Sequence, residues 1–445
     1  MGFVQIVANN MLNFLRKISP RFLKQSYHWL LARLAALIYF YPSNKLIVIG
    51  VTGTNGKSTT VNLIAQILEN LGELVALSST VNFKVAEKEW INDKKMTMLG
   101  RFATQKFLSQ AVKNKCTYII IETSSQGIEQ FRHLGINYDV LVFTNLAPEH
   151  IEAHGGFENY RAAKEKLFKH LSQSKHKIIN NKKVEKIIIS NSDDIETERL
   201  KKYQVDKFIT YATEKSADYK IENLNLNNGL VGFALQNINF KTNFLGKFNA
   251  YNILASLACV NALGFSLDKI KTTNLKGVPG RQEFVENNKD FQVMVDYAPE
   301  PESLKQLYQA LKNLHYNKLI HVLGSCGGGR DRARQPILGK MAGEFADLVI
   351  ITNEDPYDDD PQEIIDNVSS GAIQAGKELN NDLYKILDRK QAIHKALSLA
   401  EANDLVLITG KGAEQFICSK NSQQIPHDDR QVVKEYFKND LEGQI

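Results

Sequence analysis

The sequence predicts an α/β protein with two domains, each built on a mostly parallel sheet, and the first of the P-loop type. Three observations support this prediction. Apolar runs of strand length alternate with helical patterns from Lys45 onward, which is typical of a doubly wound sheet. The segment Gly53–Thr59 (GTNGKST) joins the first apolar run to a helical pattern. A second alternation of the same kind begins beyond Gly280.

The charge of the chain is unevenly distributed. Of its 445 residues, 43% are hydrophobic and 23% are charged, a composition typical of a globular protein with two or three domains. The formal net charge of +6 equals the number of cations in residues 1–45, which contain no acidic residue. These cations are Arg16, Lys17, Arg21, Lys24, Arg33 and Lys45. The remainder is balanced, so composition gives no support to nucleic-acid binding.

Residues 1–44 are predicted to form a helical segment that is rich in aromatic residues. Basic charge beside an apolar face permits contact with a membrane surface, but we favour a helical cap that packs on the next domain. The apolar run from Trp29 to Tyr41 contains Arg33 and is too short to span a bilayer. The scattered cysteines and the lack of a convincing secretory signal indicate the cytoplasm, either free or at the inner face of the membrane. The four cysteines are Cys116, Cys259, Cys326 and Cys418.

The first predicted domain covers residues 45–279 and the second covers residues 280–445. Strands are expected in the first domain at 46–50, 74–77, 118–121 and 140–144, with helices at 102–113, 160–171 and 251–263. The more polar stretch 205–245 is expected to form an antiparallel appendage to the first domain. Gly277–Gly280 (GVPG) breaks the pattern. The second domain is expected to be Rossmann-like, with strands at 291–295, 319–323, 348–352 and 405–409.

The segment GTNGKST has the residues of a phosphate-binding loop. Backbone N–H groups of such a glycine turn, and the N-terminus of the helix that follows, converge on phosphate oxygens. The positive charge of Lys57 would lie beside the outer phosphates, and the Ser58 hydroxyl would reach Mg²⁺. The strict Walker pattern is not met, because Val51 stands where its first glycine is expected. An ordinary glycine-rich turn is the alternative, but Gly-Lys-Ser between a strand and a helix favours a nucleotide site.

Polar side chains follow two predicted strands, at the edge where open α/β sheets bind their ligands. Glu122 ends the strand at 118–121, and His150 follows the strand at 140–144. Glu122 is placed to bind a Mg²⁺ that also meets Ser58 and nucleotide oxygens. The alternative for Glu122 is a solvated strand end. A histidine such as His150, considered alone, is more commonly a loop residue without a ligand role.

Further motifs follow in a fixed order. Residues 144–155 read TNLAPEHIEAHG and residues 160–168 read YRAAKEKLF. With GTNGKST and ETSSQ (122–126), these resemble the Mur ligase family, most closely its UDP-N-acetylmuramoyl-tripeptide synthetases. The resemblance continues over about nine-tenths of the chain, through GKFNAYN (246–252), GRQE (280–283), VDYAP (295–299), GKGAE (410–414) and DDR (428–430).

The resemblance implies an ATP-dependent ligase that joins an amino acid to a UDP-N-acetylmuramoyl-dipeptide in peptidoglycan precursor synthesis. ATP would phosphorylate a carboxylate of the peptide, the amine of the amino acid would attack the acyl phosphate, and phosphate would leave. Two Mg²⁺ ions are implied, one near Ser58 and Glu122 and one near His150. Lys164 would carry a CO₂-derived carbamate, an anionic metal ligand. Its helical position alone indicates an ordinary surface lysine.

Binding residues are carried over only where the motifs match. For ATP the resemblance implies Gly53, Thr54, Asn55, Gly56, Lys57, Ser58 and Thr59, with Asn249 and Asn252 near adenine and Arg281 and Asp296 near phosphate or ribose. For the muramyl peptide it implies Thr97, Ser124, Gln130 and Arg132, and for the incoming amino acid Arg330, Asp355, Gly410 and Glu414. We expect a monomer.

The chain departs from the family pattern in three ways. The synthetases carry a separate N-terminal domain for uridine diphosphate, whereas only about 44 residues precede the first predicted strand, which leaves uridine recognition open. The DNPR motif for diaminopimelate is replaced by EDPY (354–357), followed by Asp358–Asp360. Three family histidines are also replaced, by Gln126, Pro299 and Ala413.

The EDPY replacement bears on the choice of amino acid. Without the arginine fork, an acidic loop around Asp355 and Glu414 would suit a distal ammonium, and we expect lysine or ornithine to be preferred. The alternative for Asp358–Asp360 is that they cap the helix expected from Pro361.

Two other functions remain open at the level of sequence. The same acyl-phosphate chemistry could serve a lipid-linked precursor, including its amidation, or a poly-amino-acid or folyl-glutamate chain, although Ser124, Gln130 and Arg132 favour the muramyl substrate. A membrane-associated scaffold that only binds nucleotide is the third possibility. The combination of Lys57, Glu122, His150 and Lys164 argues against it.

Overall fold

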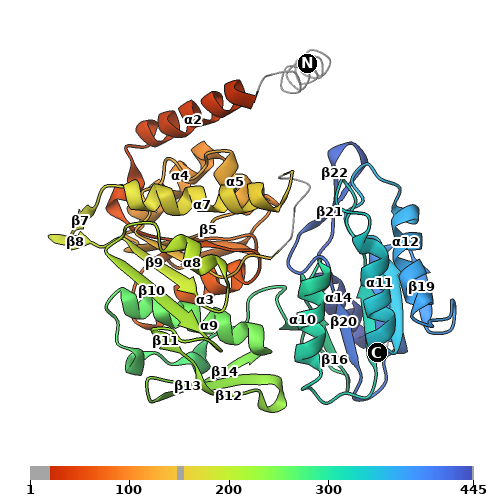
Figure 1. The fold of residues 1–445 in the computed structure, drawn as a ribbon. Helices are drawn as coiled ribbons and strands as arrows, with labels where there is room; N and C mark the ends of the chain where they lie inside the picture. Colours follow the sequence, from red (N-terminus) through yellow and green to blue (C-terminus); the bar gives the residue numbers. More distant parts are fainter. Residues whose placement is uncertain (1–20, 148–154, 443–445) are drawn as a thin grey trace.

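The chain folds into two α/β parts that lie side by side, with helix α2 (Arg21–Ile38) projecting from the first part (Figure 1). The computed structural model describes residues 21–147 and 155–442. His150 and residues 1–20 therefore lie outside the described residues. In the part of the chain that is described, no helix is long and apolar enough to cross a membrane.

The first part is built on a nine-stranded sheet in the order β11-β10-β9-β6-β1-β5-β2-β3-β4. Seven strands are parallel, and β3 and β4 extend the sheet as an antiparallel edge. The strands are β1 (Ile47–Thr52), β2 (Val75–Ser78), β3 (Asn82–Val85), β4 (Lys88–Ile91), β5 (Tyr118–Glu122), β6 (Val140–Phe143), β9 (Ile187–Asn191), β10 (Lys207–Ala212) and β11 (Tyr219–Lys220).

Helices cover both faces of this sheet because the apolar side chains of its strands alternate between two cores. Ile49 and Val51 of β1 face the core under helices α3 and α9, whereas Val48 faces the core under α4, α5 and α7. The covering helices are α3 (Lys57–Asn70), α4 (Arg101–Lys113), α5 (Ser125–Glu129), α7 (Phe157–Gln173), α8 (Glu196–Leu200) and α9 (Lys247–Ala262). A small hairpin, β7 (Lys177–Ile179) and β8 (Lys182–Val184), follows α7.

The expectation for residues 205–245 was partly wrong. A three-stranded antiparallel sheet does form, from β12 (Glu222–Asn225), β13 (Leu230–Leu235) and β14 (Ile238–Leu245). Strands β10 and β11, however, extend the main sheet in parallel, next to β9. Pairing partners decide this outcome, since β10 pairs over its length with the apolar strand β9, and a short run of residues does not reveal its neighbour.

The second part contains a six-stranded sheet in the order β15-β16-β20-β17-β18-β19. All pairs are parallel except β15 with β16. Its strands are β15 (Glu283–Phe284), β16 (Gln292–Val295), β17 (Leu319–Leu323), β18 (Leu348–Thr352), β19 (Leu383–Ile386) and β20 (Leu405–Ile408). A hairpin of β21 (Phe416–Ser419) and β22 (Gln423–Pro426) follows β20.

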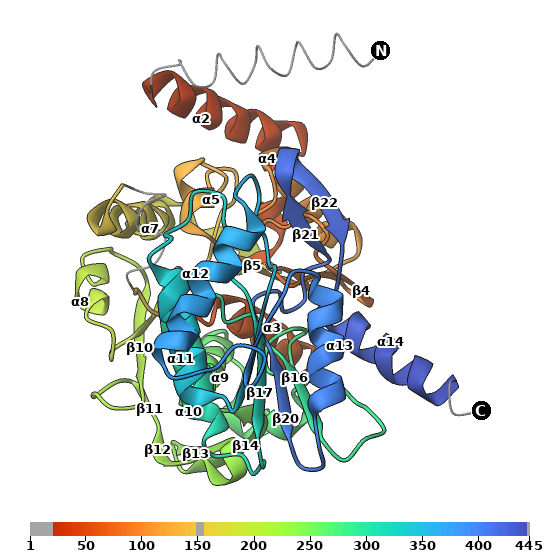
Figure 2. The ribbon, with the colours of Figure 1, turned by 90° about the vertical axis from the view of Figure 1, so that its right-hand side faces the viewer.

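Two helical layers enclose the second sheet (Figure 2). Helices α10, α11 and α12 pack on one face and α13 and α14 on the other, each over its own apolar core. The helices are α10 (Pro301–Leu311), α11 (Arg334–Phe345), α12 (Pro361–Gln374), α13 (Arg389–Leu399) and α14 (Asp429–Glu442). Asp360 caps α12 through the Gln362 N–H at 2.9 Å, so the capping alternative holds for this aspartate.

Helix α2 packs on the first part through a narrow stripe of small residues. Ala32, Ala35 and Ala36 are buried, and α2 lies against α4. Large apolar side chains on the rest of its surface are exposed, among them Tyr27, Trp29, Leu30, Leu34 and Leu37. The expected helical cap is present over these residues, although it buries only one stripe of the helix.

Candidate active site

The phosphate-binding loop lies between β1 and α3 and is hydrogen-bonded to Asn145, which follows the neighbouring strand β6. The Thr54 N–H donates to the Asn145 carbonyl at 2.8 Å, and the Asn55 N–H donates to Asn145 Oδ1 at 2.9 Å. Gly56 adopts φ of +80°, and a Cβ there would collide with the Asn252 side chain. Glycine is required at this position by both its conformation and the close approach of α9. The loop therefore presents backbone N–H groups and the α3 N-terminus in a fixed arrangement.

Lys57 and Lys164 converge on this loop from different helices. Lys57 Nζ donates to the Thr54 carbonyl at 2.7 Å. Lys164 Nζ donates to the Gly53 carbonyl at 2.6 Å and lies 4.6 Å from the centre of the Tyr160 ring. Lys164 is only 3% exposed, so its helical position alone indicated the wrong environment. It lies on the face of α7 that packs on the sheet, with its ammonium at the end of β1.

Glu122 is a buried carboxylate at the carboxyl end of β5, beside β1. Ser58 Oγ donates to its Oε2 at 2.8 Å, as expected for two groups that could share Mg²⁺. The backbone N–H of Thr80 donates to Oε2 at 2.8 Å and its hydroxyl donates to Oε1 at 3.0 Å. Sequence reasoning missed Thr80, although it closely follows strand β2 and the strand-end rule that selected Glu122 would have selected it.

The donor set of Ser58 and Glu122 fits Mg²⁺, which prefers a few protein oxygens together with phosphate oxygens and water. Within residues 21–147 and 155–442, no three His, Cys, Asp or Glu side chains form a group that could hold a metal. His150, which the resemblance implies as a further ligand, lies outside these ranges.

A hydrogen-bonded chain joins α9 to the start of the second part. Asn252 Nδ2 donates to Asn249 Oδ1 at 2.9 Å, and Asn249 Nδ2 donates to Gln282 Oε1 at 2.8 Å. The Gln282 N–H donates to Asp296 Oδ2 at 2.7 Å. Burial raises the pKa of Asp296 above its ordinary value, although the charge of Arg281 opposes this shift. The structure thus gathers the four residues expected near adenine, ribose or phosphate.

Arg281 also stacks on an aromatic ring that sequence reasoning did not select. Its guanidinium carbon lies 4.4 Å from the centre of the Tyr297 ring. Tyr297 lies in the VDYAP motif, so the motif itself was the available signal.

The residues expected to bind the peptide substrate form a second group. Arg132 donates to Gln130 Oε1 through Nε at 3.0 Å and Nη2 at 2.6 Å, and it also donates to the Met98 carbonyl. Burial lowers the pKa of the Arg132 guanidinium. Ser124 Oγ caps α5 by accepting from the Gly127 N–H at 3.2 Å. Thr97 Oγ1 accepts from the Thr80 hydroxyl at 2.9 Å, which links this group to Glu122.

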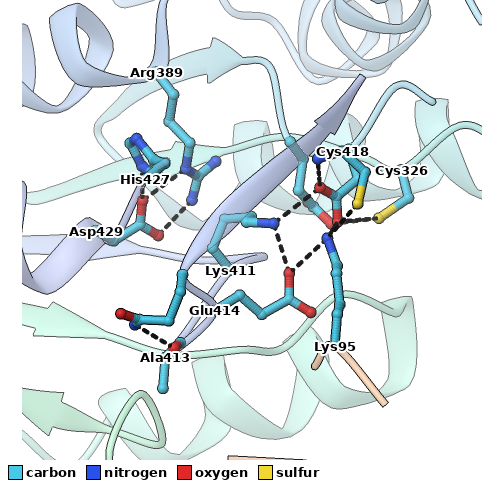
Figure 3. Close-up of polar contacts among 12 residues, drawn as sticks. Lys95, Cys326, Arg389, Lys411, Ala413, Glu414, Cys418, His427 and Asp429 are labelled. Atoms are coloured by element: carbon cyan, nitrogen blue, oxygen red, sulfur yellow. Dashed lines mark hydrogen bonds and ion pairs between the residues drawn. The ribbon is translucent and has the colours of Figure 1, made fainter. Parts of the chain in front are cut away.

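The expected amino-acid site contains more cations than the sequence indicated. Lys411 Nζ donates to Asp355 Oδ1 at 2.9 Å and to Glu414 Oε2 at 2.6 Å. Lys95, from the first part, pairs with both carboxylates as well (Figure 3). The expectation of a net acidic pocket at Asp355 and Glu414 is therefore wrong, because two lysines neutralise the two carboxylates.

The remaining aspartates of this loop also have structural partners. Asp359 Oδ2 accepts from the Gly328 N–H at 2.9 Å, and Asp358 Oδ1 accepts from the Asn421 N–H at 2.9 Å. Gly410 adopts φ of +104°, and a Cβ there would collide with the Glu354 carboxylate. Arg330 lines the cleft between the two parts, and the buried Glu354 carboxylate is among the groups that interact with its charge.

One cleft of about 1290 Å³ connects these groups. Its lining includes most of the residues selected from the sequence. They are Gly53, Thr54, Asn55, Gly56, Lys57, Ser58, Thr59, Thr97, Glu122, Ser124, Arg132, Lys164, Asn249, Asn252, Arg281, Asp296, Arg330 and Glu414. Gln130, Asp355 and Gly410 do not line it but contact residues that do. Lys95, Thr80, Tyr297 and Phe416 line it without having been selected.

A parallel sheet with a phosphate-binding loop, joined by a cleft to a second α/β part, defines a nucleotide-using α/β enzyme. Comparison with family models narrows this class. Residues 51–260 match the Mur ligase middle domain, and residues 280–412 match the Mur ligase, glutamate ligase domain. The chain belongs to the Mur ligase family, whose members are ATP-dependent acid–amino-acid ligases.

Proteins similar to this chain are named as ligases or synthetases of UDP-N-acetylmuramoyl peptides. The UDP-N-acetylmuramoyl-L-alanyl-D-glutamate--2,6-diaminopimelate ligase of Bacillus cereus is 35% identical over 91% of this chain and 81% of its own. The UDP-N-acetylmuramyl-tripeptide synthetase of Roseiflexus sp. is 34% identical over 87% of this chain and 78% of its own. A solved diaminopimelate ligase of the same name as the first is 29% identical, with a TM-score of 0.59 over 89% of this chain and 79% of its own.

Proposed function

We propose that this protein is an ATP-dependent ligase that joins an amino acid to a UDP-N-acetylmuramoyl-dipeptide in peptidoglycan precursor synthesis. One observation carries the proposal. A single cleft joins the phosphate-binding loop, the Ser58–Glu122 pair and Arg132 of the first part to Arg330 and Glu414 of the second. Such a cleft can hold a nucleotide, a peptide carboxylate and an amine at once, which is what the ligation requires.

The proposed reaction assigns a role to each of these positions. Lys57 and the α3 N-terminus bind the phosphates of ATP and stabilise the charge that develops as the γ-phosphoryl group moves to the peptide carboxylate. The amine of the amino acid attacks the resulting acyl phosphate, a C–N bond forms, and phosphate leaves with the electrons of the C–O bond. Mg²⁺, when held by Ser58 and Glu122, supplies charge neutralisation for the phosphate oxygens.

We further propose that Lys164 carries a carbamate. The fit rests on its burial and on its position at the phosphate-binding loop, with Nζ 2.6 Å from the Gly53 carbonyl. A buried ammonium next to bound metal would be repelled, whereas a carbamate supplies anionic oxygen. Its formation requires the neutral amine, which burial favours.

Residues 45–279 would bind the nucleotide and the peptide, and residues 280–445 would bind the incoming amino acid. Arg330 is the cation in the second part that suits a carboxylate of that amino acid. It lines the same cleft as Glu414. A guanidinium presents parallel N–H donors to the two oxygens of a carboxylate.

Amino-acid-dependent phosphate release with the muramyl dipeptide tests the proposal. The variant Lys57→Ala should lose about 10³-fold or more of this activity, because preorganised charge on the phosphoryl group is removed. The variant Lys106→Ala is a matched control on the exposed face of α4 and should keep wild-type activity. A Lys57→Ala enzyme with a tenth of the wild-type rate, or a wild-type enzyme that releases phosphate with no amino acid, would contradict the proposal.

The exposed face of α2 supports a second proposal, that residues 1–44 bind reversibly to the surface of an anionic membrane. Trp29, Leu30, Leu34 and Leu37 are exposed on this helix, and the six cations of residues 1–45 have no acidic neighbours in sequence. Each basic residue near an anionic surface contributes about 1 kcal/mol. The enzyme would then work at the inner face of the membrane, and a lipid-linked acceptor becomes the alternative substrate.

Sedimentation with anionic vesicles tests this attachment. The wild-type protein should bind at low salt and dissociate at high salt, whereas Leu30→Glu/Leu37→Glu should stay in the supernatant. Neutral vesicles are the control. Equal supernatant fractions for both proteins at low salt would contradict membrane binding and leave α2 with a structural role only.

A further inference from the structure

Lys95 belongs to the first part of the chain, but its ammonium group forms ion pairs with carboxylates of the second part. The residue follows β4, and its Nζ contacts the Asp355 carboxylate and lies 3.1 Å from Glu414 Oε2 (Figure 3). Asp355 precedes α12 and Glu414 precedes β21, so both carboxylates come from the second part, which is proposed to bind the amino acid. Lys95 also lines that cleft, and its side chain is 15% exposed.

The groups around this ammonium form a cage suited to a cation. Besides the two carboxylates, the Phe416 ring centre lies 5.4 Å from Lys95 Nζ and the Tyr357 ring centre lies 5.9 Å away. Carboxylates and aromatic faces are the two kinds of partner that bind ammonium groups in proteins. Tyr357 stands where the family pattern has the arginine of DNPR, so this position contributes an aromatic ring in place of a cation.

The charges of the cage are balanced without a ligand. Burial opposes the charged form of Lys95, but Glu414 and Asp355 outweigh it and hold the pKa of this ammonium well above its ordinary value. Burial also acts to raise the pKa of Asp355, but Lys411 and Lys95 outweigh it and hold this pKa below its ordinary value. Lys411, Lys95, Asp355 and Glu414 thus form a neutral set of two ammonium and two carboxylate groups.

A further ammonium could enter this set only by replacing one of the two lysines. Lys411 is 0% exposed and lies beneath both carboxylates. Lys95 follows β4, lines the cleft and is 15% exposed, so it is the lysine whose ammonium an incoming group could displace from the two carboxylates. An incoming amino acid with a terminal ammonium would therefore have to compete with Lys95.

We propose that Lys95 is a specificity-determining residue that occupies the side-chain ammonium position of the amino-acid site and so selects against lysine and ornithine. The inference rests on the proposed function, in which this end of the cleft receives the incoming amino acid. It reverses the preference for lysine expected from the acidic sequence around Asp355. It also makes the first part of the chain a contributor to amino-acid choice.

The test compares L-lysine and L-ornithine with L-norleucine, which has a similar length and no side-chain charge. Lys95→Met removes the ammonium and keeps the apolar stem, and Lys95→Arg keeps a cation. Lys94→Met changes the preceding lysine, whose ion-pair partner is its neighbour Asp93 at 2.9 Å. The kcat/KM ratio of lysine to norleucine should rise tenfold or more in Lys95→Met. It should stay near the wild-type value in Lys95→Arg and Lys94→Met.

A ratio that remains within twofold of wild type in Lys95→Met would overturn the inference, as would an equal rise in Lys94→Met. A readout without turnover separates this result from failure of the proposed function. The shift in thermal midpoint caused by lysine, relative to that caused by norleucine, should grow in Lys95→Met even if no amino acid supports phosphate release. Lys95→Gln provides a second neutral variant if the methionine variant does not fold.

Discussion

Single residues that meet at the phosphate-binding loop carry the chemistry proposed for this protein. Ser58, Glu122 and Lys164 come from α3, β5 and α7, yet each contacts the phosphate-binding loop or its first helical turn. Their side chains are buried and held by hydrogen bonds, so little reorganisation is needed when charge moves between phosphate and carboxylate. The carbamate proposed for Lys164 depends most on this environment, because its formation requires a neutral amine and burial disfavours the charged form.

Lys164→Ala is therefore expected to be nearly inactive and to recover part of its activity with short-chain carboxylic acids. The added acid would replace the oxygen ligand that the carbamate supplies. Phosphate release measured with and without acetate checks the expectation. Lys166→Ala, which removes an exposed lysine of the same helix, should be active and indifferent to acetate. An unmodified Lys164 in a crystal with Mg²⁺ and nucleotide bound would contradict the carbamate.

Helices α13 and α14 are joined by a buried ion pair. Arg389 donates to both Asp429 oxygens at 2.7 Å and to the Thr409 carbonyl at 2.7 Å. Burial acts to raise the pKa of Asp429, but Arg389 and His427 outweigh it and hold this pKa well below its ordinary value. The pair connects two helices on one face of the second sheet to the end of β20. Loss of this ion pair should therefore destabilise the packing of α13, α14 and the end of β20.

Arg389→Met should lower the free energy of unfolding by about 3–5 kcal/mol, because it leaves the Asp429 carboxylate buried without its cation. Urea unfolding at neutral pH measures the change. Lys390→Met is the matched control, since its pair with Glu435 is exposed and should contribute about 1 kcal/mol or less. Similar losses in the two variants would contradict the role assigned to the buried pair.

Both parts of the molecule contain a histidine that folding keeps neutral. Burial lowers the pKa of His133 in the first part and of His321 in the second to about 3. His321 sits between the Tyr308 hydroxyl at 2.7 Å and the Thr409 hydroxyl at 2.9 Å. Between the ordinary value of 6.5 and about 3, the unfolded chain binds protons at these positions that the folded chain excludes.

The contribution of these two histidines to the free energy of unfolding should therefore be fully present above pH 6.5 and should be lost as the pH decreases towards 3. Each histidine contributes a slope of about 1.4 kcal/mol per pH unit over this window. Urea unfolding at a series of pH values checks the sign. In the variant His321→Asn, the slope of the unfolding free energy against pH should be smaller by about 1.4 kcal/mol per pH unit. The variant His315→Gln, at an exposed position, should have the wild-type slope. A stability that rises on acidification would contradict the assignment.

Some features of this protein follow from its sequence alone. The glycine loop, the alternation of apolar runs with helical patterns and the polar strand ends indicated a parallel α/β fold and a nucleotide site. These signals are local, since turn geometry needs glycine and each parallel strand exposes its carboxyl end at one edge of a sheet. Strands β17 (Leu319–Leu323) and β18 (Leu348–Thr352) were placed within their observed bounds for the same reason.

The tertiary structure decided what depends on neighbours distant in sequence. Strand β10 joined the main sheet because β9 was available to pair with it. Lys164 became a buried group because α7 lies over the end of β1. Lys95 and Lys411 cancelled the acidic character of the loop around Asp355, although Lys95 precedes that aspartate by 260 residues. Pairing partners, burial and the sum of nearby charges are properties of the folded chain, and no local pattern encodes them.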